Sequence, residues 1–430
     1  MTASAPALAG AAHDEHSLTR ALRRLGWGVA DQGISSLSNF ALGLFVARTY
    51  GAGGFGAFTL AFVTYSVVLN ASRGLGTDPL LVRHSGPPDQ VWRRATAAAT
   101  GTALAVGVVG GVLCVAAGLL LPPTTGGGFL VLGLGLPGLM LQDSFRFAFF
   151  ACGRGRAAFA NDLVWTILLV ATLAVLLVSG AGTPAICLLV FGGTASAAAV
   201  VGALQAHVVP RPVRIRSWLR THRSLSFRYL GENVSFSLAS QIRTFVLGGV
   251  ASLAAVGYVR SSEILMGPFL VLLMGLSQVA VPEASRALAG GPARLRAFCL
   301  RLGAVQAGAA VAWGAVLLTV FPLGPGPALL GEIWGPTSRL IPPITLTVCA
   351  TSFMTAANAG LRAMGTSRRS LKAQLITATV YVTLACLGAV LGGAIGTSWG
   401  VTVAQAVGAL VSWYQLRSGL AEQERTVTAP

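Results

Sequence analysis

Long apolar runs, separated by short charged segments, dominate the chain. No Asp, Glu, Lys or Arg occurs in three stretches of 48, 48 and 44 residues, which are Ala95–Gln142, Leu163–Pro210 and Ala373–Leu416. A membrane-spanning helix needs about 20 apolar residues, so each stretch predicts two spans. Turn sequences lie where the first two pairs should divide, PPTTGGG after Leu121 and SGAGTP after Val178. The whole pattern predicts an all-α integral membrane protein with about twelve spans.

The composition agrees with this class and orients the chain. It is 54% hydrophobic and 10% charged, with a mean hydropathy of +0.73, whereas a soluble domain has roughly 25% charged residues. The net charge of +17 could suggest nucleic acid. However, all but four of the 30 Lys and Arg fall in one set of predicted loops or at the adjoining helix ends; the exceptions are Arg48, Arg243, Arg260 and Arg339. This positive-inside bias predicts cytoplasmic termini, with anionic lipid headgroups and no nucleic acid as partners.

Two parts of the chain, 201 residues apart, are similar in sequence. The shift places Asp31 on Glu232, Gln32 on Asn233 and Gly56 on Gly257. We therefore expect two parallel six-span halves, with a substrate pathway between them. The predicted divisions are a cytoplasmic N-terminal segment at 1–26, an N-lobe at 27–208, a basic cytoplasmic linker at 209–229, a C-lobe at 230–417 and a cytoplasmic tail at 418–430.

Polar stripes open the first span of each half. Asp31, Ser35 and Asn39 share one helical face, with Gln32 beside it, and Asn233, Ser237 and Gln241 do the same in span 7 near Arg243. A charge in the middle of a span costs about 2.5–3.5 kcal/mol on insertion scales. We interpret the stripes as facing a wet cavity. The alternative is that they are hydrogen-bonding contacts between helices.

Three segments resemble polysaccharide flippases of the multidrug/oligosaccharidyl-lipid/polysaccharide (MOP) exporter superfamily. They are LFVARTYGAGGFGAF at Leu44–Phe58, AAVGYVRSSEILMGPF after span 7 and LLGEIWGPTSRLIPPI before span 10. Their order and spacing carry the resemblance, which extends from about Trp27 to Arg417. It implies two lobes around a central cavity, working by alternating access in the bacterial cytoplasmic membrane. It also implies a polyprenyl-linked glycan as substrate, with polysaccharide assembly proteins as possible partners.

The resemblance adds an expectation about the site, because cavity arginines are thought to meet the lipid diphosphate in that family. Arg48 matches the arginine of the family motif, whereas Arg243 and Arg260 are included for their expected burial. The chain lacks the two extra helices of the peptidoglycan-precursor branch, which argues against that substrate. The candidate substrate-cavity residues are Asp31, Gln32, Ser35, Asn39, Arg48, Glu232, Asn233, Ser237, Gln241, Arg243, Arg260 and Glu263.

Two other functions stay open. A cation-coupled drug exporter of the same superfamily would exchange H⁺ or Na⁺ at Asp31 or Glu232, and a non-transporting scaffold would assemble polymer machinery. No enzyme is expected: GLGLPG at Gly133–Gly138 fits GxGxxG but lies in a span without a preceding strand. The six cysteines stand singly, so no metal site is expected. No cofactor is expected either, and H⁺, Na⁺ or the membrane potential would drive transport.

The predicted topology can be tested by substituted-cysteine labelling on a cysteine-free background. A cysteine at Ser217, in the basic linker, should react with a membrane-impermeant maleimide only after the cells are opened. Labelling of Ser217→Cys in intact spheroplasts would contradict both the orientation and the parallel halves.

Overall fold

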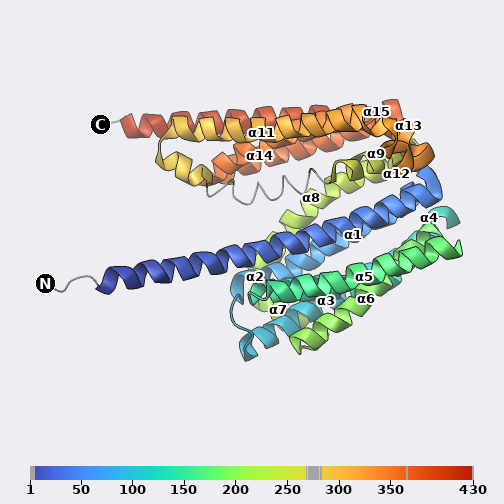
Figure 1. The fold of residues 1–430 in the computed structure, drawn as a ribbon, viewed down its shortest axis with the longest axis horizontal. Coiled ribbons are helices and arrows are strands. Elements are labelled where there is room, and N and C mark those ends of the chain that lie inside the picture. The colour runs from blue at the N-terminus through green and yellow to red at the C-terminus, as the bar shows by residue number, and fades with distance from the viewer. Residues whose placement is uncertain (1–4, 268, 270–279, 281–282, 365–366, 429–430) are drawn as a thin grey trace. The chain divides into compact units, whose positions relative to one another are not determined.

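Helices make up nearly all of the structure. The computed structural model describes residues 5–267, 269, 280, 283–364 and 367–428, and no strand occurs among them. The long helices are α1 (Ala5–Ser72), α3 (Gln90–Leu120), α4 (Pro123–Ala151), α5 (Gly155–Ser179), α6 (Pro184–Ala206), α8 (Arg223–Val250), α9 (Leu253–Leu265), α11 (Pro292–Thr319), α14 (Ile341–Ala363) and α15 (Ser367–Thr428) (Figure 1). The short helices are α2 (Asp78–Arg83), α7 (Ile215–Thr221), α12 (Pro325–Leu330) and α13 (Trp334–Ser338).

Eight helices in the described part are long and apolar enough to cross a membrane. Two of them, Gly26–Arg83 and Lys372–Glu422, have 58 and 51 residues, and about 20 suffice for one crossing. Both bend where the backbone leaves the helical region, at Gly51 in the first and at Gly392 and Gly393 in the second. The expectation of an all-α multi-pass membrane protein is confirmed. The number of about twelve spans stays a prediction.

Local sequence explains where several helices begin and end. The Asp89 carboxylate accepts a hydrogen bond from Trp92 N at 2.8 Å and caps α3. Thr183 Oγ1 caps α6 in the same way through Ile186 N at 3.2 Å. These side chains satisfy amide donors that the first helical turn leaves unpaired. Gly180 ends α5 with a φ of 64°, a conformation that glycine adopts without steric cost.

The chain divides into two compact units. Unit 1 contains Met1–Asn39 and Tyr65–Val234, and unit 2 contains Phe40–Thr64 and Ser235–Pro430. Both α1 and α8 therefore contribute to each unit. The predicted lobes at 27–208 and 230–417 are a different division, because 40–64 packs with unit 2; the lobes stay a prediction.

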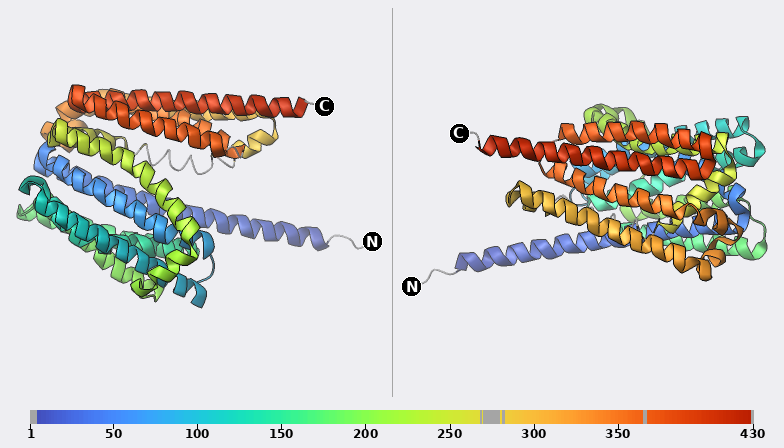
Figure 2. Two further views of the ribbon diagram at one scale, coloured as in Figure 1. Left: turned by 180° about the vertical axis from the view of Figure 1, so that it is seen from behind. Right: turned by 90° about the horizontal axis from the view of Figure 1, so that it is seen from above.

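Unit 1 is a bundle in which α3, α4 and α6 pack closely (Figures 1 and 2). A Cβ atom added to Gly135 of α4 would lie 2.9 Å from Gly192 Cα of α6, and one added to Gly111 of α3 would lie 2.5 Å from Gly133 O of α4. GLGLPG is thus a close-packed part of α4 and not a nucleotide loop. The Gly107–Gly111 pair of α3 likewise serves helix packing.

The segment predicted as the linker, 209–229, lies within unit 1. It packs there against a π-helical turn, Arg73–Thr77. Leu75 O in this turn accepts hydrogen bonds from Trp218 Nε1 at 3.1 Å and from Ser226 Oγ at 3.3 Å. His84 Nε2 and His222 Nε2 lie 3.3 Å apart beside Trp218. Burial, with the neighbouring His222, lowers the pKa of His84. One ring can donate to the other, in a direction that the tautomers set.

Unit 2 is built on α11, α14 and α15, which run side by side (Figure 2). Leu295 and Cys299 of α11 pack with Leu361 of α14 and Leu416 of α15 in a buried cluster. Trp413 Nε1 donates a hydrogen bond to Phe353 O at 3.0 Å, which ties α15 to α14. These helices form the apolar body of the unit.

Two glycines make a reciprocal contact inside unit 2. A Cβ atom on Gly56 of α1 would lie 1.8 Å from Leu253 O, and one on Gly257 of α9 would lie 2.2 Å from Ala52 O. The 201-residue shift places Ala52 on Leu253 and Gly56 on Gly257. The two contacts, Gly56 with Leu253 and Gly257 with Ala52, are therefore equivalent under this shift. A two-fold relation between the segments 52–56 and 253–257 produces this pattern.

We expect Gly56→Ala to destabilise the protein by about 1–3 kcal/mol, the cost of overpacking a core, because the new methyl group would collide with the Leu253 carbonyl. Gly53→Ala is the matched control, since a Cβ atom there meets nothing within 4 Å. Thermal unfolding of the purified protein in detergent measures the difference. Equal melting temperatures for the two variants would contradict the close contact.

Candidate functional site

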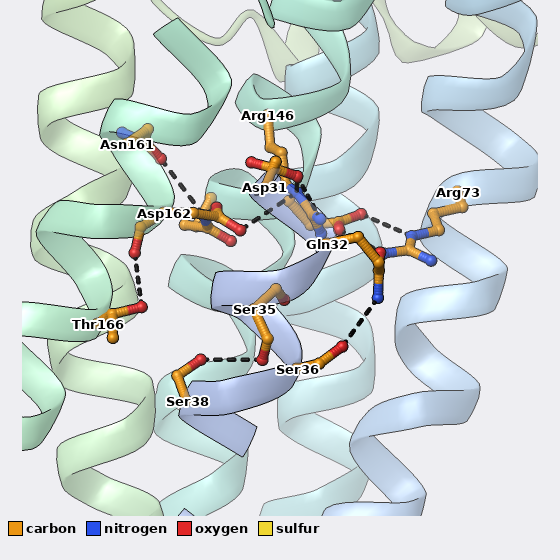
Figure 3. Close-up of polar contacts among 12 residues, drawn as sticks. Asp31, Gln32, Ser35, Ser36, Ser38, Arg73, Arg146, Asn161, Asp162 and Thr166 are labelled. Atoms are coloured by element: carbon orange, nitrogen blue, oxygen red, sulfur yellow. Dashed lines mark hydrogen bonds and ion pairs between the residues drawn. The ribbon is translucent and has the colours of Figure 1, made fainter. Parts of the chain in front are cut away.

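Five charged side chains of unit 1 form a buried group that we name the N-cluster. Its members are Asp31 of α1, Arg73 of the π-helical turn, Asp143 and Arg146 of α4, and Asp162 of α5. All but Arg73 are at most 8% exposed as whole residues, and Figure 3 shows Asp31 and Asp162 gathered around Arg146. Three carboxyl groups thus face two guanidinium groups, which leaves one carboxyl group in excess.

Arg146 is the centre of the N-cluster. Its Nε donates to Asp31 Oδ2 at 2.6 Å and lies 3.2 Å from Asp162 Oδ2; its Nη2 also pairs with Asp31 Oδ2. Arg73 pairs separately with Asp143, through Nε to Oδ2 at 2.9 Å and Nη2 to Oδ1 at 2.6 Å. Such a two-point contact is the strongest form of the Arg–carboxylate pair.

Amides complete the N-cluster on the side of α5. Gln142 Nε2 donates to Asp162 Oδ1 at 2.6 Å, and Asn161 Nδ2 donates to Ala198 O at 2.8 Å. Two buried carboxylate oxygens, Asp31 Oδ1 and Asp162 Oδ2, have no hydrogen-bond partner among the described residues, although the second lies 3.2 Å from Arg146 Nε. Burial without a hydrogen bond is costly for a charged oxygen, so these atoms could accept a proton or coordinate a small cation.

A second charged group lies in unit 2, and we name it the C-triad. Arg243 of α8 and Arg260 of α9 both pair with Glu263 of α9: Arg243 Nη2 lies 2.7 Å from Glu263 Oε1, and Arg260 Nη1 lies 3.1 Å from Glu263 Oε2. The side chain of Arg243 is 10% exposed, whereas those of Arg260 and Glu263 are 33% and 26% exposed. The two side chains from α9 are thus the more exposed part of the C-triad. The group carries one excess positive charge.

Neighbouring helices hold the C-triad. The Arg260 guanidinium lies over the Phe62 ring of α1, with Cζ 5.8 Å from the ring centroid. Gln241 Nε2 of α8 donates to Val63 O of the same segment. Arg243 Nε is buried and has no hydrogen-bond partner among the residues that the structure describes, so a donor on the inner arginine is available. The arrangement can bind an anion with several oxygens.

The remaining predicted residues are dispersed. Gln32 bonds to Ser36 within α1 at 3.3 Å, Ser35 O accepts from Ser38 Oγ at 2.9 Å, and Asn39 is exposed. Asn233 Nδ2 donates to Asp78 Oδ2 at 2.8 Å. The side chains of Glu232 and Ser237 lie outside those that the structure describes.

Arg48 lies apart from both groups. It is exposed, and its Nη1 lies 2.1 Å from where a Cβ atom on Gly331 would stand, in the loop between α12 and α13. Gly331 has a φ of 58° and no side chain, which leaves room for the guanidinium. Arg48 thus contacts a loop of its own unit, and its predicted role in substrate binding stays a prediction.

Sequence reasoning missed most of the N-cluster. Arg73 and Arg146 were counted among the arginines at inner helix ends, whereas the structure pairs both with buried carboxylates. A signal was present: Asp143 and Arg146 are three residues apart at the end of a 48-residue charge-free run, and Asp162 directly precedes another. Charges at these positions can lie inside the bundle as readily as in a loop. In the described part of the chain, no three His, Cys, Asp or Glu side chains gather as metal ligands.

We expect Arg146→Ala to destabilise the protein by about 3–5 kcal/mol, because it leaves Asp31 and Asp162 buried without their cation. Arg93→Ala removes an exposed arginine and is the control. Fluorescence-monitored thermal unfolding of both purified variants provides the comparison. The double variant Arg146→Met/Asp31→Asn should recover part of the loss; an Arg146→Ala protein as stable as Arg93→Ala would show that the ion pairs contribute nothing.

No protein-family model matches the sequence, and no curated protein matches it. Solved structures do match in fold. An inward-facing multidrug resistance MATE family transporter of the MOP superfamily has a TM-score of 0.70 and 15% identity, over 92% of this chain and 96% of that one. The lipid II flippase MurJ, in an inward closed conformation, has a TM-score of 0.72 and 11% identity, over 91% and 87%.

A third similar structure is a MOP superfamily transporter from Pyrococcus furiosus, described as having a binding pocket of reversed polarity. Its TM-score is 0.54 with 15% identity, over 94% of this chain and 95% of that one. At these identities the similarity concerns the fold. It does not single out the polysaccharide type. The chain is a multi-pass membrane protein with the fold of the MOP superfamily transporters.

Proposed function

We propose that the protein is a flippase that moves a polyprenyl-diphosphate-linked oligosaccharide across the cytoplasmic membrane by alternating access. The C-triad carries this proposal. Arg243 and Arg260 approach from two helices and converge on the two oxygens of one carboxylate. Guanidinium nitrogens recognise phosphate oxygens by charge-assisted hydrogen bonds of the same kind. The two arginines thus form an anion-binding site that suits a lipid diphosphate.

The charge of the C-triad also favours an anionic substrate. Two guanidinium groups face one carboxylate, and Phe62 covers Arg260 on one side. The excess positive charge would repel an organic cation, and partial burial strengthens this repulsion because it lowers the effective dielectric constant. A neutral glycan alone would leave that charge without a partner. A diphosphate group compensates it.

The fold similarity adds support of a different kind. Among the matching structures, MurJ is described as a lipid II flippase, so this fold is compatible with moving a large lipid-linked molecule. Members with the MATE description are multidrug resistance transporters. The choice between these substrate classes therefore depends on the site and not on the fold.

The N-cluster supports coupling to an ion. It has one carboxyl group more than it has guanidinium groups, and Asp31 Oδ1 and Asp162 Oδ2 are buried without hydrogen-bond partners. Binding of H⁺ or Na⁺ would remove the excess negative charge. Release of the ion would restore it. We infer that the driving ion binds at this group.

A cation-coupled drug exporter is the second candidate, and the same excess carboxylate favours it. An organic cation could bind at the N-cluster in place of a proton. In that case the C-triad would be dispensable for transport, and substitutions at Arg243 would affect only abundance. The two candidates therefore differ in what the C-triad contributes.

We expect Arg243→Ala to reduce export of the lipid-linked glycan at least about tenfold, because one charge-assisted contact with the diphosphate is lost. Arg243→Lys should restore export only in part, since an ammonium group lacks the planar fork. A deletion strain complemented with each variant provides the measurement. Accumulated lipid-linked intermediate would be extracted, quantified and normalised to membrane abundance.

The double variant Arg243→Ala/Glu263→Gln separates binding from structural support. If Arg243 only neutralises Glu263, the double variant should regain both abundance and export. If Arg243 binds substrate, abundance should return without export. Arg286→Ala, in an exposed pair with Glu283, is the control. Normal export by Arg243→Ala at normal abundance would overturn the proposed role.

A further inference from the structure

Glu263 occupies the place between the two arginines where a ligand oxygen would bind. Each of its carboxylate oxygens pairs with a different guanidinium, Oε1 with Arg243 at 2.7 Å and Oε2 with Arg260 at 3.1 Å. Tyr381 of α15 is close enough to interact electrostatically with Arg243 and Glu263. The carboxylate therefore neutralises one of the two positive charges in the ligand-free protein.

A site for a multiply charged anion needs such a counter-ion while it is empty. Arg243 is 9% exposed, and a buried guanidinium without a partner is strongly destabilising. The Glu263 carboxylate neutralises Arg243 and so removes the cost of burying its charge. Because it lies on α9 three residues from Arg260, it can stay beside that arginine when it leaves Arg243, which comes from α8.

The internal carboxylate does not use all the donors that the site offers. Within the described part of the chain, Arg243 Nε is buried and has no hydrogen-bond partner. A carboxylate with two oxygens already satisfies one nitrogen on each arginine. A ligand with more oxygens and more negative charge could engage these nitrogens and Arg243 Nε as well.

We infer that Glu263 is an internal competitor of the substrate's anionic group: it pairs with Arg243 and Arg260 in the ligand-free protein and leaves Arg243 when a diphosphate binds. This inference rests on the proposed function of the C-triad. It gives Glu263 a role in specificity. A ligand with one carboxylate would form the same contacts as Glu263, so it would gain little binding free energy by displacing it. A diphosphate has more negative charge and more acceptor oxygens.

The competition also serves release. A diphosphate held by two partly buried guanidinium groups without a competitor would dissociate slowly, because charge-assisted hydrogen bonds in a low-dielectric site are strong. Glu263 returns to Arg243 as the ligand leaves and compensates the charge that dissociation uncovers. Its presence thus weakens binding and makes the site reusable in each transport cycle.

Binding of inorganic pyrophosphate to the purified full-length protein in lipid nanodiscs tests the inference by isothermal titration calorimetry. Glu263→Gln keeps the shape of the side chain and removes its charge. It should bind pyrophosphate at least about tenfold more tightly than wild type, on the scale of one charge-assisted hydrogen bond. Glu283→Gln is the matched control, because Glu283 also pairs with an arginine three residues away; it should bind as wild type does.

A second measurement covers the case in which Glu263→Gln folds poorly. Without ligand this variant should melt below wild type, because Arg243 loses its counter-ion, and pyrophosphate should raise its melting temperature more than that of wild type. Arg260→Met leaves a one-to-one pair of Arg243 and Glu263. It should lose pyrophosphate binding at least about tenfold, since a single cation now faces an internal carboxylate.

The outcomes separate the two proposals. If Glu263→Gln binds pyrophosphate no more tightly than wild type, while Arg243→Ala abolishes binding, the competitor role is overturned and the anion site stands. If neither wild type nor Glu263→Gln binds pyrophosphate and the ligand leaves both melting temperatures unchanged, the anion site is overturned as well. Tighter binding by Glu263→Gln that Arg243→Ala abolishes supports both.

Discussion

The pairing of charges in an apolar bundle is the constraint on which the rest of this structure depends. The chain has few acidic groups, 13 in all, and the two charged groups described above contain four of them: Asp31, Asp143, Asp162 and Glu263. A membrane protein keeps a charge inside only when a partner or a function compensates the cost. Here each of these four carboxylates has an arginine partner.

Close helix packing is what brings these partners together. In unit 1, α3 approaches α4 and α4 approaches α6 at glycines whose added Cβ atoms would lie less than 3 Å from neighbouring backbone. α4 then lies at the centre, with Gln142, Asp143 and Arg146 on it, and its partners come from α1, α5 and the π-helical turn. A π-turn changes the register of a helix by one residue and is common at functional positions.

Much of the fold followed from the sequence because it depends on local composition. Charge-free runs of 44 to 48 residues can only be membrane helices, and the glycine and proline turns lie at the helix boundaries, as at Pro123, Gly180 and Pro184. Arg243 could be marked as an intramembrane charge for the same reason. The structure pairs it with Glu263, whereas Asp31 pairs with Arg146 in the other unit.

The N-cluster could not be assembled from the sequence because its pairs join residues far apart in the chain. Arg73 and Asp143 are 70 residues apart, and Arg146 and Asp31 are 115 apart. Composition gives the cost of each charge but not its partner. Charges near the end of an apolar run fit two interpretations, a loop position and a buried pair, and only the helix packing distinguishes them. The polar stripe of α1 shows the same limit: Asp31 is buried in the N-cluster, while Ser38 bonds to its own helix backbone.

The two charged groups differ in sign, and this difference bears on how a transporter with them could work. The N-cluster has an excess carboxylate, whereas the C-triad has an excess guanidinium. Among the described residues, Asp31 Oδ1 of the first and Arg243 Nε of the second are buried without a hydrogen-bond partner. A bound cation would neutralise the excess charge of the N-cluster, and a bound anion would neutralise that of the C-triad. Under the proposed function, ion and substrate would each bind in a unit of their own and need not compete for one site. Two helices, α1 and α8, contribute to both units, and Asp31 lies on the first and Arg243 on the second. A change in pairing at either residue would act on a helix that contributes to both units, and this is a route by which one ligand would influence the binding of the other.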